Sequence, residues 1–273
     1  MYAGTTIRRG SGRIAGVHQK VDRAARRQLK RYISKTTAFP LISDILYFEG
    51  DKGPDGIKRK SPSVDEPWHF IDPSKPDDHN LLDNINDHIY NLSVALKTDN
   101  IVRASFEAAW LAHAVVDGLT PSHHYPMGDK IQELWGMAHD ERGSITGKNI
   151  IHGENGLDTL LKNWEYWGAG GVFTTHYMFE LGTATAITNV SYKGNYLTMR
   201  DINRLKREGY EAVFMRSLHK IDSMKMYDEL GRKRGWTRRL ATQAKLILIP
   251  EMIKAVTLAW HAAVLMSESK NQR

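Results

Sequence analysis

The sequence contains no cysteine among its 273 residues. This absence excludes a disulfide-stabilised scaffold, a zinc site built from thiolates and a cysteine nucleophile. It leaves the redox environment open, because a chain without thiols suits oxidising and reducing compartments alike. The hydrophobic fraction of 41% and the charged fraction of 25% are typical of a chain that folds around a core.

Long apolar runs are missing as well. The first twenty residues contain none, so no ordinary signal peptide is visible. The apolar stretch near the C-terminus is interrupted by Lys245, Pro250, Glu251 and Lys254, which argues against a transmembrane helix. We therefore expect a cytoplasmic protein. Its excess of 38 basic over 31 acidic residues, a net charge of +7, favours contact with polyanions or an anionic membrane surface.

The apolar residues recur at helical spacing along most of the chain, and the alternation of a β-strand is hard to find. The stripes predict one all-α domain with long functional loops at 49–66 and 140–156. Five stripes carry this prediction: Val17, Val21, Ala25, Leu29 and Ile33; Leu82, Ile85, Ile89, Leu92 and Leu96; Phe106, Ala109, Trp110 and His113, ended by Gly118 and Pro121; Phe173, His176, Glu180, Ala184 and Ile187; and Met252, Val256, Trp260 and Val264, beginning after Pro250.

Several common motifs fail on inspection. The segment 143–149 resembles a P-loop but has one residue too few between its glycines and no terminal Ser or Thr. A ferritin-like di-iron centre needs a second ExxH motif besides Glu66–His69. His139 and Asp140 would suit a helical HD-type phosphohydrolase, which leaves the motif around His113 unexplained.

Histidine and acid pairs four residues apart are the more informative pattern, because this spacing puts both side chains on one helical face. Chance predicts about one such pair here. The sequence has four: His18/Asp22, His79/Asp83, His113/Asp117 and His176/Glu180. Asp83 falls off its apolar stripe, so we expect the second pair to be solvated.

The pairs at His113 and His176 lie on apolar faces, where burying a carboxylate is costly unless it is paired or bound to a metal. Either pair alone is compatible with a hydrogen-bonded pair in the core. Two such pairs, with His123 and His124 close in sequence, favour a metal site.

Three segments then stand in a recognisable order: YFEGDKGPD at 47–55, PWHFIDP at 67–73 and AWLAHAVVDGLTPSHHYP at 109–126. In this order they resemble the zinc-dependent phospholipase C and P1 nuclease superfamily. The resemblance implies a mostly helical fold with a trinuclear zinc cluster at the base of a cleft. It covers residues 14–267, with 1–13 as an N-terminal extension and 124–171 as an insertion.

The resemblance also implies a ligand set, with Asp117 bridging two metals and Asp55 both binding a metal and orienting the attacking water. Asp72 and His124 are expected to hold the ligands in place. The alternatives to the last two ligands, His176 and Glu180, are His139, His152 and Glu165. The implied metal ligands are His18, Asp55, His69, His113, Asp117, His123, His176 and Glu180.

Two departures from the family pattern are visible. In secreted members a mature N-terminal tryptophan binds a zinc, whereas seventeen residues precede His18 here. We therefore expect the site that uses His18 to be incomplete, empty or filled differently. Gly56 follows Asp55 and gives no counterpart to the family's headgroup pocket, so choline specificity is not expected.

The chemistry that follows is metal-dependent hydrolysis of a phosphodiester by two or three zinc ions. A phospholipase C-like activity on phospholipid is the first expectation, and the Gly53-Pro54-Asp55 turn and the His176/Glu180 spacing favour it. The alternatives are an S1/P1-type nuclease acting on nucleic acid and a non-catalytic, metal-stabilised protein. Basic residues at Lys58–Lys60 closely follow Asp55 and are the charged cluster nearest to the expected site.

Overall fold

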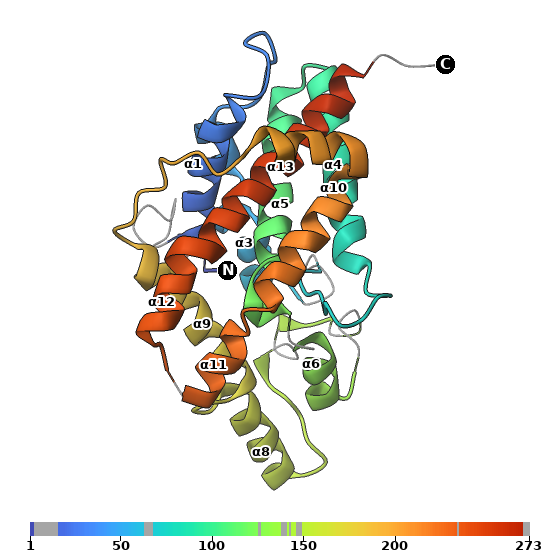
Figure 1. Ribbon diagram of the computed structural model, residues 1–273. Coiled ribbons are helices and arrows are strands. Elements are labelled where there is room, and N and C mark those ends of the chain that lie inside the picture. Colours follow the sequence, from blue (N-terminus) through green and yellow to red (C-terminus); the bar gives the residue numbers. More distant parts are fainter. Residues whose placement is uncertain are drawn as a thin grey trace.

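The protein is built from helices (Figure 1). The computed structural model describes residues 1–2, 16–62, 68–124, 127–137, 141, 143–145, 149–233 and 235–269. No strand occurs within these ranges, which confirms the all-α prediction.

The elements follow one another with short connections over most of the chain. In order they are α1 (Val17–Leu29), α2 (Ile42–Tyr47), η1 (Gly50–Lys52), α3 (Pro54–Lys60), α4 (Asn80–Lys97), α5 (Ile101–Gly118), η3 (Pro121–His123), α6 (Met127–Trp135), α8 (Gly156–Trp167), α9 (Val172–Ile187), α10 (Met199–Asp222), α11 (Met226–Lys233), α12 (Arg238–Gln243), η5 (Ala244–Leu248) and α13 (Ile249–Glu268).

The core forms around α13, which packs against α1, α4, α5 and α10 (Figure 1). All four residues of its predicted stripe are buried. Trp260 is fully buried and donates a hydrogen bond from Nε1 to the carbonyl of Ala108 in α5, at 2.9 Å. This bond satisfies the one polar atom of a large apolar side chain, and it fixes α13 against the helix that carries His113 and Asp117.

Helix α13 begins at Ile249, before Pro250, whereas the sequence predicted a start after this proline. A proline inside a helix lacks an N–H and its ring crowds the carbonyl four residues before it. Pro250 is accommodated here because the π-helical turn η5 joins α12 to α13 without a break. The combined run Arg238–Glu268 is long and apolar enough to cross a membrane, but 78% of its most apolar window is buried inside the protein, as in a core helix.

Two other predicted stripes need correction at their ends. Ile33 lies beyond the end of α1. Phe173 is 37% exposed, so the buried face of α9 is formed by Phe179, Glu180, Thr183, Ala184 and Ile187 instead. Pairs of neighbouring aromatic side chains, among them Phe173 with Trp167 and with Tyr177, lie along this exposed side.

The predicted loop at 49–66 contains two short helices, η1 and α3. Pro54 stands at the first turn of α3, where its missing N–H costs nothing, and Asp55 follows it. In the loop at 140–156, described residues are mostly irregular, while His139 and Asp140 lie outside the described residues.

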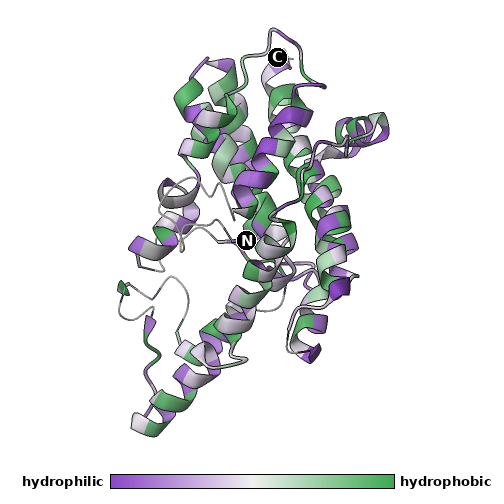
Figure 2. Ribbon diagram, turned by 90° about the vertical axis from the view of Figure 1, so that its left-hand side faces the viewer, coloured by the Kyte–Doolittle hydropathy of each residue, from purple (hydrophilic) through white to green (hydrophobic). Residues whose placement is uncertain are grey.

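The segment 124–171 contributes α6 and α8. A small apolar cluster of Leu134, Trp135 and Ile151 holds it together, and Tyr166 of α8 packs against this cluster. At the lower end of the molecule α8 extends away from the helices of the core (Figure 1), and the helix at this end carries both hydrophobic and hydrophilic residues (Figure 2).

The end of α5 approaches its neighbours closely at Gly118. A methyl group added there would lie 2.6 Å from Cδ2 of Leu81 and 2.8 Å from Cζ of Phe214, both fully buried.

We predict that Gly118→Ala lowers the free energy of unfolding by about 1–3 kcal/mol through overpacking, measured by urea denaturation. Gly231→Ala in α11, where no atom lies within 4 Å, should be neutral or stabilising by up to ~1 kcal/mol. Equal effects of the two substitutions would contradict the close approach.

Candidate metal centre

Most of the residues predicted as metal ligands come together where the ends of several helices meet. His18 lies in the first turn of α1, and Asp117 lies in the last turn of α5 with His113 one turn before it. His123 belongs to the short turn η3, and Glu180 lies near the middle of α9. Segments separated by more than 150 residues of sequence thus contribute to one buried cluster.

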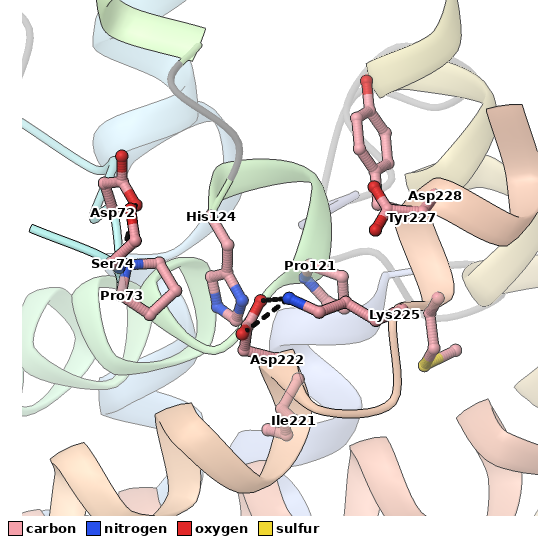
Figure 3. Close-up of a pocket in the computed structure, with 11 residues that line it drawn as sticks. Asp72, Pro73, Ser74, Pro121, His124, Ile221, Asp222, Lys225, Tyr227 and Asp228 are labelled. Carbon is pink, nitrogen blue, oxygen red and sulfur yellow. Dashed lines mark hydrogen bonds and ion pairs between the residues drawn. The ribbon is translucent and has the colours of Figure 1, made fainter.

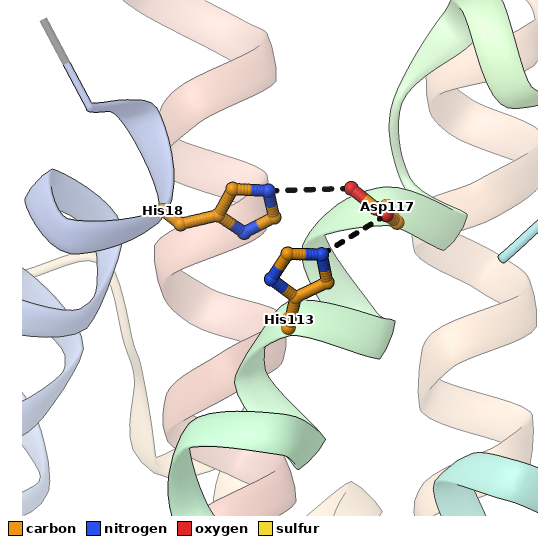
Figure 4. A group of neighbouring side chains, drawn as sticks. All are labelled: His18, His113 and Asp117. Atoms are coloured by element: carbon orange, nitrogen blue, oxygen red, sulfur yellow. Dashed lines mark ion pairs between the residues drawn. The ribbon is translucent and has the colours of Figure 1, made fainter. Parts of the chain in front are cut away.

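The first group consists of His18, His113 and Asp117 (Figure 4). The two imidazole rings are stacked, with their centroids 3.9 Å apart and their planes 3° from parallel. Nε2 of His18 lies 3.3 Å from Oδ1 of Asp117, and Nε2 of His113 lies 3.3 Å from Oδ2. All three residues are buried.

The second group repeats this arrangement with His123, His176 and Glu180. Its imidazole rings are stacked with centroids 4.8 Å apart and an angle of 15° between planes. Nε2 of His123 and Nε2 of His176 each lie 3.0 Å from Oε1 of Glu180. His176 is the most accessible of the three, with 16% of its side chain exposed, so the second group is open on one side.

The amino group of Met1 lies between the two groups. It contacts Oδ1 of Asp117 and lies 3.2 Å from Oε1 of Glu180. Met1 and Tyr2 are buried, and the carbonyl of Tyr2 accepts a hydrogen bond from the backbone N–H of Val17 at the start of α1. The amino group of Met1 therefore lies next to the same oxygen of Asp117, Oδ1, that Nε2 of His18 faces.

The spacing of these atoms fits a tetrahedral metal site. Zinc binds imidazole nitrogen and carboxylate oxygen at about 2.0–2.2 Å, which places neighbouring ligand atoms about 3.3 Å apart. Among described residues, Nε2 of His113 and both ring nitrogens of His18 have no hydrogen-bond partner, although each Nε2 faces Asp117. Buried nitrogens that face a carboxylate without hydrogen-bond geometry are suited to sharing a cation with it.

Hydrogen bonds on the far side of the rings orient two of the histidines. Nδ1 of His113 donates to Oε1 of Glu49 at 3.0 Å, and Nδ1 of His123 donates to the carbonyl of His69 at 3.1 Å. Each bond leaves Nε2 pointing into the cluster, which is the arrangement that metal-binding histidines adopt. Glu49 was not among the predicted site residues, and no local spacing connects it to His113.

The pKa values of the titratable groups in the cluster are strongly shifted from their ordinary values. Burial works to raise the pKa of Asp117 and of Glu180, but the Met1 ammonium outweighs it with other nearby cations, and both pKa values lie well below the usual range. Burial also works to lower the pKa of His113, yet Asp117 and Glu49 raise it to about 10. His123 is different, because burial dominates and lowers its pKa to about 3.

These pKa shifts indicate which groups of the cluster carry a proton when no metal ion is bound. Asp117 and Glu180 are carboxylates, His113 is an imidazolium and His123 is neutral. The ring of His123 lies between two acceptors, the carbonyl of His69 at Nδ1 and Oε1 of Glu180 at Nε2. A neutral ring can donate to only one of them, so the other faces a lone pair until a cation separates the two atoms. Binding of a metal ion would therefore release the proton of His113 and relieve this contact.

Asp55, the predicted catalytic residue, lies at the edge of the first group. Its Oδ1 is 3.7 Å from Nε2 of His113 and 3.4 Å from Nζ of Lys58. Burial works to raise its pKa, but Lys58 and His113 outweigh burial and the pKa is lowered. With 21% of the side chain exposed, Asp55 is a carboxylate that reaches toward solvent, whereas Asp117 is fully enclosed.

Lys58 adds a further cation to the cluster, beside the Met1 ammonium and the His113 imidazolium. Its Nζ lies 3.2 Å from Oδ2 of Asp117. Burial works to lower the pKa of Lys58, but Asp117 and Asp55 outweigh it and the pKa is raised, so the side chain is an ammonium ion. The sequence indicated only that a basic cluster follows Asp55.

The remaining predicted ligand, His69, lies beside the second group. Its ring centroid is 5.2 Å from that of His123 and 4.0 Å from that of Phe70, and it is not part of either three-residue group. Of the residues predicted to compete with His176 and Glu180, His152 is exposed on the surface and Glu165 forms an ion pair with Lys130 at 2.9 Å. The pair His79/Asp83 is exposed, as predicted.

Asp72 and His124, expected to orient ligands, lie instead at a cavity of about 180 Å³ between the 72–74 segment and the end of α10 (Figure 3). Oδ1 of Asp72 accepts hydrogen bonds from Ser74, and Nε2 of His124 donates to the carbonyl of Gly118 at 2.8 Å. His124 thus supports the backbone next to Asp117, and Glu49 takes the orienting role expected of them.

A pair of matched substitutions tests whether this cluster holds metal. Asp117→Asn removes the charge that faces both imidazoles of the first group, and Asp83→Asn makes the same change in an exposed His–x3–Asp pair. We predict that Asp117→Asn loses at least one zinc ion per chain relative to wild type, while Asp83→Asn loses none, by elemental analysis. Equal zinc content in both variants would show that Asp117 is no ligand.

Chelation of the metal should also lower the melting temperature of the wild-type protein, since metal binding stabilises the folded state.

Comparisons with family models, with curated proteins and with solved structures found no match to this chain. What it does must therefore be inferred from its own residues. The strongest of these observations is the pair of neighbouring buried groups, each with two imidazoles and one carboxylate.

Proposed function

We propose that this protein is a metal-dependent phosphodiester hydrolase with phospholipase C-like activity. The observation that carries the proposal is the paired arrangement of two His–His–acid groups that share the Met1 amino group between their carboxylates. Imidazole and carboxylate ligands of this kind suit zinc. Metal ions held close together are typical of enzymes that cleave phosphate esters.

Bound zinc would supply positive charge for the phosphate oxygens and would make water acidic enough to attack phosphorus at neutral pH. The chain's own groups do the rest. Asp55 is ionised and partly exposed, so it is placed to accept a hydrogen bond from the attacking water and orient it. Lys58 presents an ammonium at the same edge of the cluster, where it would attract the phosphodiester anion.

The reaction that these groups support adds water across one P–O bond. The water oxygen forms a new bond to phosphorus, the bond to the leaving oxygen breaks, and a proton from water ends on that leaving oxygen. A phospholipid would give a phosphorylated headgroup and a diacylglycerol. The partly exposed His176 and Asp55 mark the side from which such a substrate would approach.

Exposed apolar side chains on α8 favour a lipid substrate over a nucleic acid. Leu157, Leu160, Leu161 and Trp164 follow helical spacing, and each is more than half exposed. Helices that present leucine and tryptophan on one face are typical of proteins that lie at a membrane surface. An enzyme that acts on phospholipid needs such contact, whereas one that acts on nucleic acid does not.

The proposal predicts that wild-type protein loaded with zinc releases phosphorylated headgroup from phospholipid vesicles. His113→Ala should reduce the rate at least about 100-fold, because it removes a group that faces Asp117 and Asp55. The matched control is His79→Ala, which changes an exposed histidine and should leave the rate unchanged.

The same preparations should be offered single-stranded DNA across a salt series, since binding to nucleic acid weakens steeply with salt. Nucleotide release without headgroup release would replace the phospholipase assignment by a nuclease. Absence of both activities in protein that holds zinc would favour a non-catalytic, metal-stabilised protein.

A further inference from the structure

The cluster contains a lysine in a place where a metal ion would otherwise be expected. Lys58 lies three residues after Asp55 on α3, so both side chains project from the same side of this short helix. Its Nζ is 3.4 Å from Oδ1 of Asp55 and 3.2 Å from Oδ2 of Asp117. One ammonium group thus contacts two of the carboxylates that the sequence assigns to metal binding.

The oxygens of Asp117 are divided between different partners. Oδ1 faces Met1 and His18, and Oδ2 faces His113 and Lys58. On the Oδ2 side, the ammonium supplies the positive charge that the two carboxylates need. The Lys58 side chain is 20% exposed and the Asp117 side chain is fully buried, so the ion pair closes the cluster toward solvent.

An ammonium fixed between two carboxylates repels a second cation at the same position, and a dication more strongly than a monovalent one. The two His–His–acid groups lie beside a different ammonium, that of Met1, which contacts Oδ1 of Asp117 and lies 3.2 Å from Oε1 of Glu180. An α-amino group gives up its proton more readily than a lysine side chain does, so a metal ion can replace that proton there. Each group presents two imidazole nitrogens and a carboxylate oxygen within 4.8 Å of one another.

We infer that Lys58 takes the place of one metal ion, so that the centre binds one ion at each His–His–acid group and none between Asp55 and Asp117. The inference deepens the proposed function, on which it rests, by fixing the composition of the centre. It also assigns Lys58 a positioning role, since the ammonium holds Asp55 at the edge of the cluster.

Metal stoichiometry tests this inference. Wild type, Lys58→Met and the control Lys60→Met, which changes an exposed lysine on the same helix, are equilibrated with excess zinc, separated from free metal and analysed for zinc per chain. Methionine keeps the length of lysine without its charge. We expect Lys58→Met to bind one more ion than wild type and Lys60→Met to bind the same number.

Equal zinc content in wild type and Lys58→Met would overturn the inference. This outcome is distinguishable from a failure of the proposed function. The inference about Lys58 is tested by the difference in zinc content between the variants, whereas the proposed function is tested by phospholipid hydrolysis by the wild-type protein. Three ions in wild type would also overturn it.

A second measurement needs no variant and remains decisive if Lys58→Met does not fold. Wild type is treated briefly with acetic anhydride, with and without zinc, and acetylation of each lysine is quantified by mass spectrometry. Lys58 should stay protected in both samples relative to Lys60. Exposure of Lys58 on zinc loading, to the extent of Lys60, would show that the metal displaces the ammonium and would overturn the inference.

Discussion

The architecture of the site depends on the burial of a single carboxylate, that of Asp117. It is fully enclosed and lies in the last turn of α5, where the partial negative charge of the helix end adds to the cost of an anion. A buried carboxylate is stable only if positive charge or hydrogen bonds replace its water. Four groups surround its two oxygens: the Met1 amino group, His18 of α1, His113 of α5 itself and Lys58 of α3.

The same requirement explains why helices distant in sequence converge here. His18 reaches Asp117 only because α1 packs against α5 and α13, and the bond from Trp260 to Ala108 fixes α13 on α5. Gly118 allows the end of α5 to approach Leu81 and Phe214 closely. The packing of the core and the assembly of the charged cluster are therefore two aspects of one arrangement, and changes in one are felt in the other.

Much of this arrangement follows from patterns within single helices. The spacing of His113 and Asp117, and of His176 and Glu180, on apolar faces is local information, and the structure brings both pairs into the cluster while leaving His79 and Asp83 at the surface. Contacts that depend on tertiary packing have no such signal. Met1 and Lys58 reach Asp117 from 116 and 59 residues away, and no periodicity predicts these distances or that of Glu49 to His113.

The central claim is that each His–His–acid group binds one metal ion. X-ray diffraction from crystals grown with zinc, recorded on both sides of the zinc absorption edge, tests it most directly. We predict two anomalous peaks per chain, one beside Nε2 of His18 and His113 with Asp117, and one beside Nε2 of His123 and His176 with Glu180. Zinc found only at surface residues, with both groups lacking an anomalous peak, would contradict it.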